Sequence, residues 1–125
     1  MRLLVDSNAL IWAVSRPSEL ALGTRKALED PDNERLVSIA AMWEIAIKIS
    51  VGKLSLPDSI PAALNLIGAE PLSIAPDHIL RLQNLPHHHR DPFDRMMIAQ
   101  ALEENLTIVT RDRAFRAYGV PLLAA

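Results

Sequence analysis

The sequence predicts one α/β domain over residues 1–125, a three-layer α/β/α sandwich around a central, mainly parallel sheet of about four to five strands. A chain of 125 residues normally folds around one core, and half of its residues are hydrophobic, as in globular proteins. Short apolar runs alternate with helical patterns along the chain. This alternation is typical of a parallel sheet with helices on both faces.

The first strand is expected over residues 2–6, because RLLVD is a short, nearly continuous apolar run, the pattern of a strand buried on both faces. Apolar residues then recur at helical spacing over 7–14, which predicts a helix that ends before Pro17. Ser18 is suited to cap a second helix that runs to about Glu29, where a turn-forming stretch begins.

In the middle of the chain, a short strand over residues 35–38 leads into a strongly patterned helix over 39–49, which Gly52 ends. A helix over 61–68 and a strand over 71–74 follow. These elements continue the alternation of strands and helices begun at the start of the chain.

The last third contains two more helical patterns, over residues 76–85 and 92–105. The apolar run at 107–110 predicts a strand, and a short helical turn through Phe115 separates it from a last edge strand over 120–123.

Composition excludes several kinds of protein. The chain has no Cys, which rules out disulfides and thiolate metal sites and favours the cytoplasm. No apolar run approaches the roughly 20 residues of a membrane span, and MRLLVDSNALIW is a poor signal peptide. The net charge of −2 excludes a uniformly basic nucleic-acid binder, although arginines concentrate in the last third.

Four carboxylates occupy positions where a parallel sheet binds ligands, beyond the carboxyl ends of its strands. Asp6 ends the first predicted strand, and Asp112 follows the strand at 107–110. Asp94 lies in the first turn of its helix. Glu44 lies within IAAMWEIAI, where a charge is costly to bury unless it is paired or bound to a cation.

Each carboxylate also has a purely structural interpretation. Asp6 and Asp91 are suited to cap the helices that follow them, Glu44 can pair with Lys48, and Asp112 can start a turn. Carboxylates brought to one end of a sheet repel one another, however, and require a compensating positive charge. In a chain without Cys, oxygen donors favour Mg²⁺ or Mn²⁺.

Four segments together resemble a known family: LLVDSNALIW, SIAAMWEIAIK, HHHRDPFDRMMIAQA and LTIVTRDRAF. In order and spacing they resemble the PIN-domain ribonucleases, and among these the VapC-type toxins of bacterial toxin–antitoxin pairs. The resemblance covers essentially the whole chain. It implies a PIN-like sandwich whose acidic pocket binds Mg²⁺ or Mn²⁺ and cleaves RNA. It also implies a homodimer, held inactive by a cognate antitoxin through which any contact with DNA is made.

The same resemblance assigns catalytic and metal-binding positions to Asp6, Glu44, Asp94 and Asp112. Asp6, Asp94 and Asp112 would hold the principal ion, while Glu44 would hold a second ion or position the water. Asp91 belongs to the DPFDR motif and serves as an extra ligand or as the helix cap.

One departure from the family concerns the residues after the first aspartate, where many relatives have Thr-His and this chain has Ser7-Asn8. Asn8 can hydrogen-bond a phosphate, but it cannot carry a proton as histidine does. We expect Asn8, Arg95 and Arg111 to contact the RNA, since arginine binds phosphate well. The alternative for the arginines is ion pairing with acidic residues on the protein surface.

Three further groups of residues have less specific expectations. Ser7 and Thr110 are placed to orient a carboxylate or a water. His87–His89 are expected to form a polar rim leading to the site, or a plain solvated loop. Trp12 and Trp43 are expected to pack internally or in a dimer interface.

Two other enzyme classes lack their required residues. A phosphatase that forms an aspartyl-phosphate needs a second Asp where Asn8 stands, and a receiver domain needs a lysine later than Lys53. The main alternative is a catalytically silent PIN-like subunit that binds within a toxin–antitoxin repressor complex.

Overall fold

The computed structural model describes residues 1–125. Five strands form one sheet in the order β3-β2-β1-β4-β5, and every neighbouring pair is parallel. The strands are β1 (Arg2–Val5), β2 (Glu34–Ser38), β3 (Glu70–Leu72), β4 (Thr107–Thr110) and β5 (Leu122–Ala124). The predicted α/β architecture with a central parallel sheet is confirmed.

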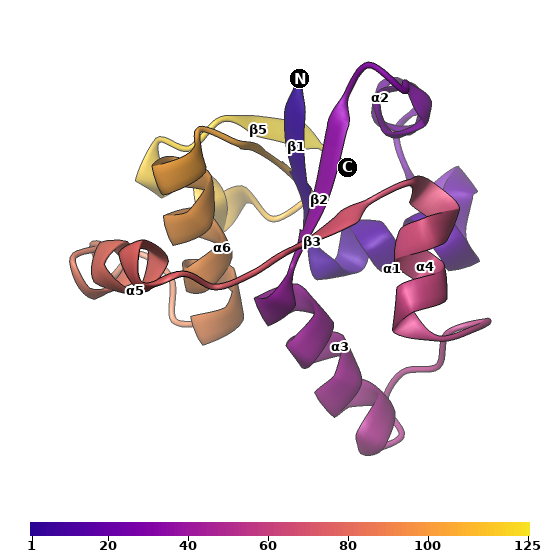
Figure 1. Ribbon diagram of the computed structural model, residues 1–125, viewed down its shortest axis with the longest axis horizontal. Coiled ribbons are helices and arrows are strands. Elements are labelled where there is room, and N and C mark those ends of the chain that lie inside the picture. Colours follow the sequence, from indigo (N-terminus) through magenta and orange to yellow (C-terminus); the bar gives the residue numbers. More distant parts are fainter.

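Helices cover both faces of the sheet (Figure 1). They are α1 (Ser7–Ser15), α2 (Leu22–Glu29), α3 (Ile39–Ser50), α4 (Ile60–Ile67), α5 (Pro76–Gln83) and α6 (Pro92–Glu104), with 3₁₀ segments η1 (Pro17–Glu19) and η2 (Arg113–Tyr118). Helices α5 and α6 lie on one side of the strands, and α1, α2 and α4 lie on the other. Helix α3 extends past the carboxyl ends of the strands. No helix is both long enough and apolar enough to cross a membrane.

The second predicted helix begins later than expected. Instead of one helix from Ser18, the chain makes the 3₁₀ turn η1, and α2 starts only at Leu22. Between them Leu20 is extended, with φ −80° and ψ 142°, and its side chain is buried in the core. Burial of Leu20 therefore outweighs the local capping preference of Ser18.

The apolar runs form strands because the sheet is covered on both faces. Leu3, Leu4 and Val5 of β1 are fully buried, as are Ile108 and Val109 of β4. Helix α6 adds a continuous buried surface against the same core. The central strands therefore form a rigid support for the residues that follow their ends.

Strand β1 is the point from which the chain builds the sheet in two directions. It pairs with β2 on one side and with β4 on the other, and the later connections run outward to β3 and β5. In open parallel sheets the connections diverge at such a point and leave a crevice beyond the carboxyl ends. Asp6 directly follows β1, and Asp112 lies two residues past β4, so both border this crevice.

Candidate active site

Asp6 is buried at the carboxyl end of β1 and caps helix α1. Its Oδ1 atom accepts a hydrogen bond of 2.8 Å from the backbone N–H of Ala9. The pKa of Asp6 is raised to about 6, mainly by burial and in smaller part by the carboxylates of Glu44 and Asp112, while hydrogen bonds from Thr110 and Ala9 act in the opposite direction. Asp6 is thus a helix cap that also lies close to two other carboxylates.

Glu44 reaches the same region from helix α3. Its side chain is only 13% exposed and its two oxygens have different partners. Ser7 Oγ donates a hydrogen bond of 2.6 Å to Oε1, and Lys48 Nζ lies 3.5 Å from Oε2. The i,i+4 ion pair with Lys48 is therefore present, and the Ser7 hydroxyl orients a carboxylate as the sequence suggested.

Asp91 and Asp94 open helix α6. Asp91 is the cap: its Oδ1 accepts from the backbone N–H of Phe93 at 2.9 Å and of Asp94 at 3.1 Å. The Asp94 side chain contacts the loop before α6, where its Oδ2 lies 2.9 Å from His89 Nε2. Burial raises the pKa of Asp94 to about 7, with Asp91, Glu44 and Asp6 adding to the rise and His89 opposing it.

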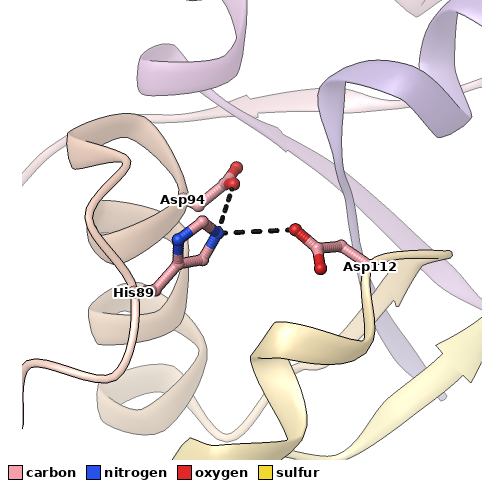
Figure 2. Close-up of side chains that lie close together, drawn as sticks. All are labelled: His89, Asp94 and Asp112. Carbon is pink, nitrogen blue, oxygen red and sulfur yellow. Dashed lines mark hydrogen bonds and ion pairs between the residues drawn. The ribbon is translucent and has the colours of Figure 1, made fainter.

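Asp112 is placed by the turn that follows β4. Its backbone N–H donates to Thr110 Oγ at 3.0 Å, and its Oδ1 accepts from the backbone N–H of Ala114 at 2.9 Å, which caps η2. The other oxygen, Oδ2, lies 3.4 Å from His89 Nε2. His89 Nε2 therefore lies between Asp112 and Asp94, which belong to different elements (Figure 2).

The four carboxylates predicted from sequence thus come together at the switch point of the sheet. Their mutual repulsion is visible in the pKa values: Glu44 raises that of Asp6 and Asp94, and Asp112 raises that of Asp6. Lys48 and His89 are the only basic side chains that pair with these carboxylates. Carboxylate oxygens are the donors preferred by Mg²⁺ and Mn²⁺, so the residues present fit a hard divalent cation.

His89 is the residue of this site that sequence reasoning missed. The prediction treated His87–His89 alike as a rim, but only His89 reaches the carboxylates (Figure 2). His87 and His88 are exposed, and the His88 ring packs edge-on against Tyr118 at 5.2 Å. In the sequence, the only indication of this role is that His89 lies just before α6. That position does not distinguish which of the three adjacent histidines faces the carboxylates.

The arginines expected to contact RNA have other partners. Arg95 is only 9% exposed, and its guanidinium donates to backbone carbonyls and to the Tyr118 hydroxyl. Arg111 lies over the Trp12 ring at 4.1 Å and pairs with Glu19 at 3.8 Å. Both arginine side chains therefore make their contacts within the protein. Asn8 is exposed on the first turn of α1, beside Ser7.

Trp43 borders the site on its exposed side. Trp43 is 59% exposed, so it does not pack internally, and its predicted place in a dimer interface stays a prediction. Its ring meets that of Phe93 edge-on at 5.1 Å, and both line a cavity of about 730 Å³ together with His89 and Arg90. Each of the two aromatic residues directly precedes a carboxylate of the site, Glu44 or Asp94. The cavity adjoins the acidic cluster at His89, which lines the cavity and contacts Asp94 and Asp112.

Comparison with known proteins gives matches over nearly the whole chain. The PIN domain family model matches residues 3–121. The chain is 27% identical to ribonuclease VapC22 of Mycobacterium tuberculosis over 94% of this chain and 92% of that relative. Its fold matches a chain of VapBC2 from Rickettsia felis bound to a DNA fragment from their promoter, with a TM-score of 0.76, 16% identity and 98% of each chain covered. It also matches a chain of FitAcB from Neisseria gonorrhoeae, with a TM-score of 0.64, 20% identity and coverage of 98% and 96%.

Proposed function

This chain belongs to the PIN-domain family, and from that premise we propose that it is a Mg²⁺- or Mn²⁺-dependent endoribonuclease that hydrolyses RNA phosphodiester bonds and acts as a toxin neutralised by a cognate antitoxin. The observation that carries the proposal is the convergence of Asp6, Glu44, Asp94 and Asp112 at one crevice. The ribonuclease relative supports the reaction, and the VapBC neighbours support an antitoxin partner.

In the proposed site, Asp6, Asp94 and Asp112 hold the principal cation, and Glu44 holds a second cation or positions the attacking water. A bound divalent cation supplies Lewis acidity, which activates water and offsets charge on the phosphate. The protein contributes rigid placement. Asp6 is fixed by its cap to α1, and Ser7 fixes Glu44. We assign Asp91 to the cap of α6, because its Oδ1 accepts two backbone N–H groups.

The RNA is proposed to approach along the cavity beside the acidic cluster. Arg90 lines this cavity, is exposed and makes no side-chain ion pair within the chain, so it is available for a phosphate. Asn8, exposed beside Ser7, is the second candidate for such a contact. We propose Arg90 and Asn8 as RNA contacts in place of Arg95 and Arg111, because the guanidinium groups of Arg95 and Arg111 already have partners within the chain.

A second copy of the chain is proposed to pack on helix α3. Ile39, Trp43 and Ile47 recur every four residues along this helix, and all three are exposed. Contiguous exposed apolar side chains of this kind mark interaction surfaces in soluble proteins. We further propose that any contact with DNA is made by the antitoxin, and that an RNA substrate and an antitoxin place the protein in the cytoplasm.

The decisive test is cleavage by the purified chain, free of antitoxin, of a mixed pool of structured and unstructured RNAs with Mg²⁺, Mn²⁺ or EDTA. Asp94→Asn is the test variant. Asp77→Asn is its matched control, because Asp77 also follows a proline in the first turn of a helix and lies on the exposed face of α5. We expect metal-dependent cleavage by the wild type and by Asp77→Asn, and none above background by Asp94→Asn.

Calorimetry with MnCl₂ separates two explanations of a negative result. Mn²⁺ binding by the wild type that is lost in Asp94→Asn would support the metal site and indicate that the pool lacks the RNA target. Absence of Mn²⁺ binding in the wild type would contradict the nuclease proposal and favour a catalytically silent binding subunit.

A further inference from the structure

The His89 ring is held in one orientation by the backbone that follows it. Its Nδ1 atom accepts a hydrogen bond of 3.0 Å from the backbone N–H of Arg90, and the N–H of Asp91 lies at 3.5 Å from the same atom. An imidazole nitrogen that accepts a hydrogen bond carries the lone pair, so the proton of the neutral ring is on Nε2. The Nε2–H group faces Asp94 Oδ2 at 2.9 Å and Asp112 Oδ2 at 3.4 Å.

This tautomer disfavours direct coordination of a metal by His89. A ligating Nε2 would need its lone pair, which would move the ring proton to Nδ1 and set it against the N–H of Arg90. In its observed orientation the ring donates a hydrogen bond to Asp94 and directs the same N–H edge toward Asp112, 3.4 Å away. Such outer partners orient metal ligands in many proteins, and their loss typically weakens metal affinity or activity by roughly 10–100-fold.

The loop that carries His89 is tied to both elements that bear these carboxylates. The backbone N–H groups of His88 and His89 donate to the Tyr118 hydroxyl at 3.0 and 2.8 Å, and Tyr118 belongs to η2, which Asp112 caps. Arg95, on the same helix as Asp94, donates to that hydroxyl at 3.2 Å. The position of His89 is therefore fixed relative to the two carboxylates by contacts that do not involve its ring.

We infer that His89 is a positioning residue that holds Asp94 and Asp112 in register through its Nε2–H, so that the pair is preorganised for a divalent cation. The inference rests on the proposed function. Asp94 and Asp112 come from different elements and repel each other when ionised, and the Nε2–H dipole that lies between them offsets part of that repulsion. His89 does not supply a metal–ligand bond.

The test is the affinity of the full chain for two cations, measured by isothermal titration calorimetry with MgCl₂ and with MnCl₂, together with RNA cleavage. The variants are His89→Ala, His89→Gln and His87→Ala. His89→Gln keeps an N–H donor at a similar reach, and His87→Ala removes an exposed neighbour on the same loop. His89→Leu keeps apolar bulk beside Phe115, 5.9 Å away, and replaces His89→Ala if that variant unfolds.

We expect His89→Ala to weaken Mg²⁺ and Mn²⁺ binding to the same extent, by roughly 10–100-fold. His89→Gln should recover most of the affinity, and His87→Ala should bind both cations as tightly as the wild type. Three results would overturn the inference. Loss of Mn²⁺ affinity alone would make His89 a ligand, because nitrogen donors favour Mn²⁺ over Mg²⁺. Tighter binding of both cations would make it an occupant of the cation position, and unchanged binding would show that the contacts are not coupled to the metal.

The wild-type measurement separates this inference from the proposed function. A wild-type chain that binds neither cation contradicts the metal-dependent nuclease itself. A wild-type chain that binds Mg²⁺ and Mn²⁺ and cuts RNA, with His89→Ala indistinguishable from it, contradicts only the role given to His89.

Discussion

Ser7 and Glu44 are joined by a hydrogen bond of 2.6 Å between Ser7 Oγ and Glu44 Oε1, which links the residue after Asp6 to the carboxylate on α3. Both side chains are largely buried, so water does not easily replace the hydroxyl. The bond therefore sets the orientation of Glu44 relative to the end of β1.

Ser7→Ala is accordingly expected to lower RNA cleavage by roughly 10-fold, because an orienting partner of a site carboxylate is lost. Folding should be less affected, with a loss of about 1 kcal/mol for one hydrogen bond. The control is Ser50→Ala. Ser50 lies at the end of α3, the helix that carries Glu44, and its hydroxyl donates only to the Ile47 carbonyl. Equal activity of Ser7→Ala and the wild type would remove Ser7 from the site.

The stability of the metal-free chain should fall as pH rises. The pKa values of Asp6 and Asp94 are raised on folding from 3.8 to about 6 and about 7. The folded chain therefore binds protons more tightly than the unfolded chain between about pH 4 and pH 7, and stability is lost as pH rises through this window. In EDTA, we expect the Tm of the wild type to drop between pH 5 and pH 8.

Asp94→Asn removes one of these two carboxyls and isolates its contribution. At pH 8 in EDTA the variant should melt several degrees above the wild type, and its Tm should vary less with pH. Differential scanning calorimetry across this range gives both quantities. A variant with a lower Tm than the wild type at pH 8 would show that the ionised Asp94 carboxylate does not destabilise the metal-free fold.

Saturating Mn²⁺ at pH 8 should restore the stability that the metal-free wild type loses. A ligand that binds only the folded chain stabilises it by about 2.7 kcal/mol at a concentration 100 times its Kd. Asp94→Asn should show little of this rise. EDTA added after Mn²⁺ should return the wild type to its lower Tm. A Tm that changes with neither Mn²⁺ nor EDTA would contradict a metal site.

Arg95 should matter for stability far more than its neighbour Arg90. Its buried guanidinium donates to the carbonyl of Pro86 at 2.8 Å and to the Tyr118 hydroxyl at 3.2 Å, and Arg95→Gln removes these hydrogen bonds from a largely buried position. We expect a loss of roughly 2 kcal/mol or more in urea unfolding. Arg90→Gln, at an exposed side chain, should leave unfolding unchanged and weaken RNA binding. The reverse ranking would contradict the roles given to the two arginines.

Trp43→Glu should convert the proposed homodimer into a monomer. The substitution places a charge in the exposed apolar face of α3 formed by Ile39, Trp43 and Ile47. Leu66→Glu is the matched control, since Leu66 is 70% exposed but belongs to α4. Sedimentation velocity should detect a monomer only for Trp43→Glu. A monomeric wild type, or dissociation by both variants, would exclude α3 as the interface.

The meeting of the four carboxylates could be anticipated because it depends on features that are local in sequence. Apolar runs mark the strands, and parallel strands end at one edge of the sheet, so Asp6 and Asp112 had to approach each other. Glu44 was conspicuous because its neighbours are apolar.

The environments of His89 and Arg95 could not be anticipated, because both depend on Tyr118, which is more than 20 residues away in sequence. Arg95 also donates to backbone carbonyls. Every residue has a carbonyl, so the sequence does not indicate which of them will accept a hydrogen bond from Arg95. The late start of α2 has a similar cause, since the burial of Leu20 is decided by the assembled core.

The site draws on residues 6, 44, 89, 94 and 112, and the strands β1 and β4 that position its ends are paired although about 100 residues separate them. No fragment that ends before β4 contains all five residues. During synthesis, Asp112 cannot join the other carboxylates until the segment that forms β4 and η2 has left the ribosome. For the ribonuclease proposed above, catalysis would therefore begin only after the rest of the fold exists.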